Sequence, residues 1–311
     1  MRNPKKSNCV LCQERSVKYA WIKEHSSIYN INSMCKVLKV SRNAYYSWLD
    51  GTCGKKEDVI LYSLIKSAFY ELQKTHGARR LKGFLLNTYG LIISRRRVSK
   101  IMKAQNLRTK HKRRFRVITT DSKHNYAISP NRLRRDFYAS SPNKVYVGDI
   151  TYIHTKEGVL YLSTVIDLYS RSIVGYAIDD RMYTRLIVNA LTVAKNKRIN
   201  MQETIFHSDR GSQYASDEFR TMLNKFGIIQ SMSAKGDCWD NAVAESFFKA
   251  IKTELIYHAK FNTKQEAVRA IEEYINFYNN KRLHSYNGYL SPTTKEARWW
   301  VNYYKNERVA A

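Results

Sequence analysis

The chain has 311 residues, and 43% of them are hydrophobic, which is enough for the cores of two or three domains. No window approaches 18 uncharged apolar residues, and the N-terminus lacks the apolar core of a signal peptide. We therefore predict a cytoplasmic protein that has no membrane partner.

The net charge of +28 is unevenly distributed along the chain. Residues 1–140 contain 31 Lys and Arg against 8 Asp and Glu, whereas residues 141–311 contain 23 against 18. This asymmetry predicts an N-terminal half that binds nucleic acid, joined to a more neutral catalytic or interaction part. The alternative, a merely solvated basic surface, would repel itself strongly unless an anion were bound.

Residues 1–54 have the pattern of a helix-turn-helix region. One helix is expected over residues 17–30, followed by two short helices joined at Lys39 and Val40. Ser41 is a natural N-cap for the second of these, which places Arg42 at its DNA-facing start. The alternative is a small helical packing unit without DNA contacts.

Residues 55–107 predict a second helical DNA-binding region. An amphipathic run over residues 57–74 is followed by a helix that ends at Gly90. Ser94 then caps a helix whose first turn is three arginines, and this is unfavourable for the helix dipole unless an external anion is bound. We expect DNA phosphates to contact its basic residues, with a solvated face as the alternative: Arg95, Arg96, Arg97 and Lys100.

Residues 108–143 are expected to form a basic linker, because they show neither helical nor strand periodicity and include Pro130. Cations in such a segment can follow a phosphate backbone, and each neutralised phosphate steepens the salt dependence of binding. The predicted contacts are Lys110, Lys112, Arg113, Arg114 and Arg116.

From residue 144 the pattern changes to strands. Three strands within residues 144–178 are joined by short turns, the first at Glu157 and Gly158, which predicts an antiparallel meander. Helices and strands then alternate, which indicates an α/β domain over residues 144–262 with a mixed sheet and helices on its faces. Residues 263–311 are expected to form a helical extension with DNA contacts at Lys281, Arg282 and His284.

Three carboxylates stand out in this α/β domain. Asp149 lies in the middle of an apolar strand, where a half-buried acid needs a partner. Asp209 ends a short strand, and Gly211 permits the turn that exposes it. Glu245 lies on the polar face of an amphipathic helix. Acids from two strands and a helix could therefore meet in one shallow groove and hold a metal.

Other polar residues nearby receive structural interpretations. We expect Asp167 and Arg171 to fix a strand end, and either Asp237 or Asp240 to cap the helix that carries Glu245. His207 shares a strand face with Asp209 and either packs behind it or reaches DNA. Substrate contacts are also expected from the loop residues Ser212, Gln213 and Tyr214.

The sequence segments around the three acids resemble those of a known family. There are 59 residues between Asp149 and Asp209 and 35 between Asp209 and Glu245. The segments VGDITYI, HSDRGSQY and DNAVAESFFKAIKTE resemble the D, D, E triad of the transposase and retroviral-integrase superfamily, and are most similar to the second-frame (OrfB-like) protein of IS-three-type bacterial insertion sequences. The resemblance extends over nearly the whole chain, through KVLKVSRNAYYSW, GARRLKGFLL and NFYNNKRLHSYNGYLSP.

The resemblance implies a ribonuclease-H-like catalytic domain with a mixed five-stranded sheet and a pair of Mg²⁺ ions, for which Mn²⁺ can substitute. It assigns Asp149 to both metals, Asp209 to one and Glu245 to the other. It also implies a basic residue at Lys252, which lies two helical turns after Glu245 and can hold a phosphate of the scissile strand.

The implied activity is metal-dependent cleavage at transposon ends followed by strand transfer, without a covalent protein–DNA bond. The implied setting is a homo-oligomer on DNA, associated with the bacterial nucleoid. We find no upstream leucine heptad, so we expect a second-frame product that acts either alone or with the upstream-frame protein as a partner. Two alternatives remain: an inactive DNA-binding regulator of transposition, and a nuclease of the same fold without strand transfer.

Overall fold

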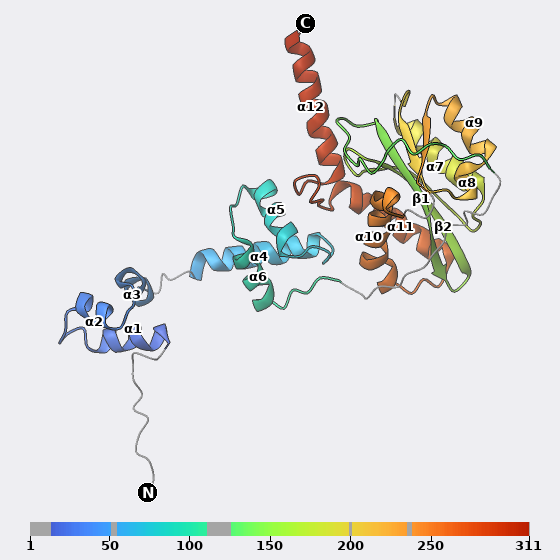
Figure 1. Cartoon of the computed structure of the whole chain (residues 1–311). Helices are drawn as coiled ribbons and strands as arrows, with labels where there is room; N and C mark the ends of the chain where they lie inside the picture. Colours follow the sequence, from blue (N-terminus) through green and yellow to red (C-terminus); the bar gives the residue numbers. More distant parts are fainter. Residues whose placement is uncertain (1–13, 51–54, 111–125, 199–200, 235–237, 311) are drawn as a thin grey trace. The chain divides into compact units, whose positions relative to one another are not determined.

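A computed structural model describes residues 14–50, 55–110, 126–198, 201–234 and 238–310 (Figure 1). The chain divides into two compact units, residues 1–67 and 68–311. Across the described ranges, every helix is too short or too polar to cross a membrane. Four of the predicted phosphate contacts lie outside the described residues: Lys112, Arg113, Arg114 and Arg116.

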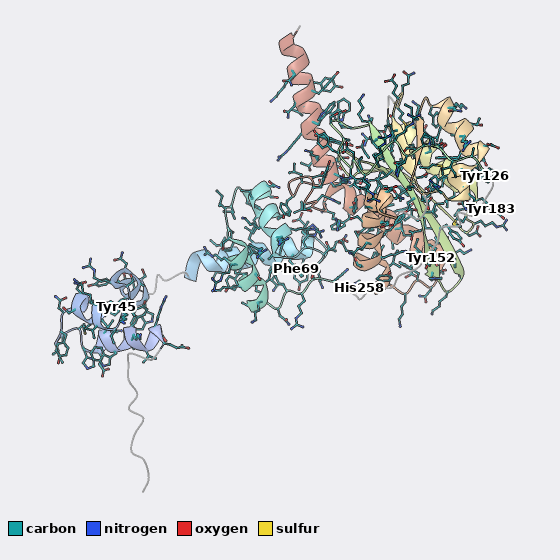
Figure 2. The ribbon with its side chains drawn as sticks, in the orientation of Figure 1. Tyr45, Phe69, Tyr126, Tyr152, Tyr183 and His258 are labelled. Carbon is teal, nitrogen blue, oxygen red and sulfur yellow. The ribbon has the colours of Figure 1, made fainter. Side chains whose placement is uncertain are left out.

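The first unit contains three short helices, α1 (Arg15–Glu24), α2 (Ile31–Val37) and α3 (Arg42–Leu49). They pack around a buried cluster that includes Tyr45, which is labelled in Figure 2. Ser41 caps α3 as predicted, and its Oγ accepts from the Ala44 amide at 3.4 Å. The first helix ends at Glu24 instead of residue 30, because Asn30 is needed in an extended conformation to cap α2.

Helix α4 (Lys55–Glu71) contains the boundary between the two units. It is followed by α5 (Ala78–Tyr89) and α6 (Arg95–Ala104). Gly90 ends α5 with a φ of 66°, a left-handed conformation that glycine adopts without strain. Ser94 caps α6 through a 3.2 Å hydrogen bond from the Arg97 amide, as predicted.

A mixed five-stranded sheet forms the centre of the second unit and confirms the predicted fold class (Figure 1). The strand order is β3-β2-β1-β4-β5. Strands β1, β2 and β3 pair antiparallel, whereas β4 and β5 extend the sheet in parallel with β1. The bounds are Val145–Thr155 for β1, Gly158–Asp167 for β2, Ile173–Asp179 for β3, Ile205–Ser208 for β4 and Ile229–Met232 for β5.

Helices cover both faces of this sheet. On one face, α10 (Ala242–Glu254) and α11 (Lys264–Asn280) pack on side chains such as Val147. On the other face, α7 (Thr184–Lys197), α8 (Ser212–Ala215) and α9 (Asp217–Lys225) pack on side chains such as Tyr146. Two 3-10 turns flank α10, at Cys238–Asn241 and Ile256–His258, and α12 (Pro292–Ala310) completes the described chain. Successive side chains of β1 point to opposite faces of the sheet, so Tyr146 and Val147 pack in different cores.

Residues 126–143 are the second half of the predicted basic linker, and their first part contacts the edge strand β5. Ser129 Oγ donates to Gln230 Oε1 at 2.7 Å, and the Arg132 amide donates to Ser231 Oγ at 2.9 Å. Leu133 is buried in the same core as α10. This segment therefore packs as part of the α/β unit.

Candidate active site

Asp149 lies at the centre of β1, directly after Gly148. A side chain at Gly148 would overlap the Phe206 ring, so glycine is needed for β1 to approach β4 this closely. The Asp149 carboxylate accepts from the Ile150 amide at 2.8 Å. Burial, followed by the charge of Asp209, raises the pKa of Asp149 well above its usual value. The strand thus holds an acid whose charge is poorly tolerated.

Asp209 is the residue that follows β4. In the parallel pairing of β1 with β4, Val147 lies opposite His207. Continued for two residues, this register brings Asp149 level with Asp209. The amide of Gly211 donates to Asp209 Oδ1 at 3.0 Å, which holds the carboxylate at the start of the next loop. Two acids that are far apart in sequence thus lie side by side on neighbouring strands.

Glu245 lies in the first turn of α10, on its exposed face, while Ala244 and Phe247 are buried against the sheet. Its charge also raises the pKa of Asp149. Two turns further along α10, Lys252 is half-buried, and burial lowers its pKa against the opposing influence of Asp149. The three predicted acids and the predicted lysine therefore act on one another electrostatically.

This donor set fits divalent cations chemically. Carboxylate oxygens are the ligands that Mg²⁺ prefers, and a cation would relieve the repulsion that now acts on Asp149. Within the described residues, however, no three His, Cys, Asp or Glu side chains are close enough together to hold a metal ion.

The side chains behind and beyond Asp209 are largely structural. His207 is buried, and its ring nitrogens lie 2.8 Å from Ser231 Oγ and 3.3 Å from Ser233 Oγ. Burial lowers its pKa to about 4, so the ring is neutral and packed. Tyr214 was expected at the substrate, but it is fully buried in the core beneath α9. The ring of Tyr214 packs among the apolar side chains of that core, and this packing fixes its position.

Asp240 does not cap α10, because the N-cap residue of that helix is Asn241. Asp237, the other residue expected in this role, lies outside the described residues. Asp240 is buried and accepts from Asn131 Nδ2 at 2.8 Å, Arg135 Nε at 2.9 Å and the Ala234 amide at 2.8 Å. It thus joins the segment along β5 to the start of the helix that carries Glu245. Its side-chain partners are about a hundred residues away, beyond the reach of local sequence patterns.

Arg282 was expected to contact DNA, but it is buried against the last turn of α10. Its Nη2 donates to Glu254 Oε1 at 2.7 Å and its Nε to Oε2 at 2.9 Å. Tyr274 donates its hydroxyl to the same carboxylate at 2.8 Å, and Arg80 Nη1 lies 3.8 Å away. His284 lies 3.2 Å from Arg282 Nη1 and belongs to this buried group, whereas Lys281 is exposed.

The strand-end role expected for Asp167 is confirmed. Asp167 is buried and accepts from the amides of Asn143 and Tyr169, both at 2.8 Å. Burial, followed by the charge of Glu296, raises its pKa to about 6. Arg171 lies on the Tyr286 ring, 3.9 Å from its centre. Both residues fasten the turn between β2 and β3.

The basic residues predicted to contact DNA phosphates are mostly at the surface. Arg42 is exposed at the start of α3 in the first unit. In the second unit Lys110 is half-buried, and the basic residues of α6 are all exposed: Arg95, Arg96, Arg97 and Lys100. Their contact with DNA stays a prediction.

Comparison with known families matches most of the chain. Residues 139–238 and 245–298 each match an integrase core domain, and residues 56–115 match an HTH-like domain. The transposase InsF of insertion sequence IS3A from Escherichia coli K12 is 36% identical over 285 residues, which cover 89% of this chain and 97% of that protein. The chain belongs to the IS3-type insertion-sequence transposases.

A second relative of this transposase family is the uncharacterized 31 kDa protein of insertion element IS600 from Shigella sonnei. It is 42% identical over 262 residues, which cover 83% of this chain and 96% of that protein. Asp149 and Asp209 fall within the first integrase core match, and Glu245 is the first residue of the second.

Solved structures of an integrase catalytic core and of an intasome are also similar to this transposase. The catalytic core of HTLV-2 integrase in complex with magnesium, in its trimeric form, has a TM-score of 0.40 at 15% identity and covers 51% of this chain and 99% of that one. A chain of the simian T-cell lymphotropic virus intasome in complex with the PP2A regulatory subunit B56 gamma has a TM-score of 0.41 at 17% identity. It covers 67% of this chain and 66% of that one.

Proposed function

We propose that this chain is a DNA transposase that cuts the ends of its own insertion sequence and joins them to new DNA. The observation that carries the proposal is the grouping of Asp149, Asp209 and Glu245 within an integrase core, where the latter two raise the pKa of the first. A protein that only binds DNA would gain nothing from three acids that repel phosphates. Their presence favours catalysis over the regulator alternative.

Asp149, Asp209 and Glu245 would hold two Mg²⁺ ions, or Mn²⁺ in their place. Cations bound there would act as Lewis acids that offset charge on the attacking and leaving oxygens of an in-line displacement at phosphorus. Lys252 would bind a phosphate of the strand being cut, because its ammonium group lies near enough to Asp149 for their charges to interact.

Two displacements account for the reaction. In the first, a water oxygen bonds to the phosphorus at the transposon end, the bond to the 3′ oxygen breaks, and that oxygen leaves as a hydroxyl. In the second, the freed 3′ oxygen bonds to a phosphorus of the target strand, whose own 3′ oxygen leaves and takes up a proton. The second step exchanges one phosphodiester for another, so no external energy source is needed.

DNA binding would come mainly from the cationic half of the chain. The exposed residues of α6 supply one phosphate-binding surface, and the HTH-like match over residues 56–115 includes that helix. We also propose a homo-oligomer on DNA, in which each transposon end would have its own active site. We also propose the upstream-frame protein as a partner and the nucleoid as the place of action.

The test is an end-cleavage and joining assay with labelled DNA from the termini of the element, in Mg²⁺. We expect cut and joined products from the wild type, and neither from Asp149→Asn, Asp209→Asn or Glu245→Gln, with DNA affinity retained. Asp217→Asn, at an exposed acid of α9, is the matched control and should keep full activity.

The alternatives give different outcomes in the same assay. A wild type that cuts but never joins would indicate a nuclease. One that binds without cutting, even with the upstream-frame protein added, would indicate a regulator. Cleavage that persists undiminished in Asp149→Asn would overturn the assignment of the site.

A further inference from the structure

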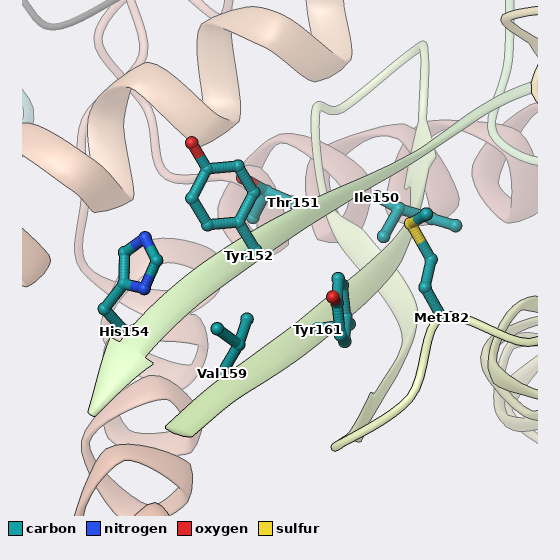
Figure 3. A pocket seen from close by; sticks show the side chains of 7 residues that line it. All are labelled: Ile150, Thr151, Tyr152, His154, Val159, Tyr161 and Met182. Atoms are coloured by element: carbon teal, nitrogen blue, oxygen red, sulfur yellow. The ribbon is translucent and has the colours of Figure 1, made fainter. Parts of the chain in front are cut away.

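The hairpin of β1 and β2 carries a shallow cavity of about 280 Å³ (Figure 3). In the antiparallel register Tyr152 lies opposite Tyr161, and His154 lies opposite Val159, so these side chains share one face of the hairpin. Tyr152 and Tyr161 are half-buried and His154 is exposed. The cavity is lined mainly by Ile150, Tyr152, His154, Val159, Tyr161 and Met182.

Two contacts tie this cavity to the candidate active site. On one side, Lys252 Nζ lies 5.1 Å from the centre of the Tyr152 ring, and the same lysine feels the charge of Asp149. On the other side, Gln213 Nε2 donates to the Met182 carbonyl at 3.1 Å, so the loop after Asp209 holds the cavity wall. A DNA strand with a phosphate on Lys252 would have its neighbouring base at Tyr152.

The chemistry of the cavity selects for a flat aromatic group attached to an anion. Pockets for drug-sized ligands run from about 300 to 1,000 Å³, so this one suits a single small ring system. Aromatic side chains stack on any nucleobase with a gain of about 1–3 kcal/mol per base, and a lysine beside them would attract the phosphate. An apolar peptide would leave the charge of Lys252 without a counterpart.

We propose that this cavity stacks an unpaired nucleobase next to the phosphodiester that is cut. We call it the tyrosine subsite, and it consists of the lining residues named above, with Tyr152 and Tyr161 as its aromatic side chains. The proposal rests on the proposed transposase function. It adds a requirement that the acids alone do not impose: the DNA must be melted or frayed beside the cleavage point. The subsite holds the displaced base and so keeps the strand positioned while phosphorus reacts.

The probe is a DNA end whose last bases are unpaired, with 2-aminopurine placed in turn at each position around the cleavage point. Stacking quenches the fluorescence of 2-aminopurine. We expect quenching at one position with the wild-type chain, and its loss in Tyr152→Ala and Tyr161→Ala. Affinity for the frayed end should fall roughly 5- to 150-fold in Tyr152→Ala, which corresponds to the stacking range. A second set of DNA probes, with 2-aminopurine in the target DNA, shows whether the stacked base comes from the transposon end or from the target.

Three controls keep the test sharp. Tyr152→Phe keeps the ring and should keep the quenching. Tyr138→Ala removes a tyrosine that is 69% exposed and lies outside the cavity, and it should behave as wild type. An abasic nucleotide at the quenched position should bind the wild type and Tyr152→Ala equally well.

Thermal unfolding first confirms that Tyr152→Ala and the wild type are both folded. Equal quenching of 2-aminopurine by the two proteins would then overturn the proposal of a tyrosine subsite. Binding is measured without Mg²⁺, so the result does not depend on cleavage. Position-specific quenching without cleavage, even with the upstream-frame protein and Mg²⁺ added, would reject the proposed function and leave the subsite standing. Cleavage without position-specific quenching would do the reverse.

Discussion

Replacing Glu254 with Gln is expected to destabilise residues 68–311 by about 3–5 kcal/mol, the usual cost of removing one partner from a buried ion pair. Glu254 is 8% exposed and accepts hydrogen bonds from Arg282 and Tyr274, with Arg80 also nearby. Burial acts to lower the pKa of Arg282, but the hydrogen bonds and charge of Glu254 outweigh it and raise that pKa above its ordinary value. Without the carboxylate, two guanidinium groups would face each other in a buried site.

The effect should be visible in thermal and urea unfolding. In a unit of this size each 1 kcal/mol shifts the unfolding temperature by about 2–4 °C, so the variant should unfold roughly 6–20 °C below the wild type. Glu273→Gln, at an exposed acid of α11, is the control and should stay within about 0.5 kcal/mol. The double variant Glu254→Leu/Arg282→Met should recover most of the loss, because it removes both charges together.

A loss smaller than about 1 kcal/mol in Glu254→Gln would refute this reasoning, since it would mean that the pair is solvated and not buried. The same result would also return Arg282 to the set of candidate DNA contacts.

Three further outcomes follow from the site and its surroundings. The pKa of Asp167, about 6, lies above its usual value, so the folded state is stabilised while this carboxyl is protonated. The free energy of unfolding of the wild type should therefore fall by about 3 kcal/mol as pH rises from 4 through 6. Urea titrations of Asp167→Asn at each pH should not show this fall. Arg95→Ala should lower the salt slope of DNA binding by about 0.9 if that residue contacts one phosphate, and an unchanged slope in filter binding would remove it from the interface. Mg²⁺ should raise the unfolding temperature of the wild type but not of Asp149→Asn, whereas an equal rise in both would place the ion elsewhere.

Local features of the fold were predictable from the sequence because they depend on neighbouring residues. Ser41 and Ser94 cap helices through amides three positions away, and Gly90 ends α5 in the one conformation that favours glycine. The alternation that placed Asp149 in a strand and the helical period that left Glu245 exposed were equally local. The elements and their types therefore followed from short-range patterns.

Contacts between distant segments were not predictable in this way. Arg282 and His284 looked like free cations of a polar loop, and only the tertiary structure brings Arg282 to Glu254. Asp240 looked like a cap because it precedes a helix, whereas its buried bonds reach Asn131 and Arg135. The local sequence around a polar residue does not show which distant residue will form its hydrogen bonds. These contacts could therefore be assigned only from the three-dimensional structure.

The parallel pairing of β1 with β4 has a consequence for synthesis of the protein. Asp149 emerges from the ribosome long before Asp209 and Glu245, since three strands and a helix separate the first two acids. A nascent chain that ends at β3 carries a single carboxylate with neither companion. The three acids therefore cannot come together until synthesis has passed Glu245, and every shorter nascent chain lacks the complete triad.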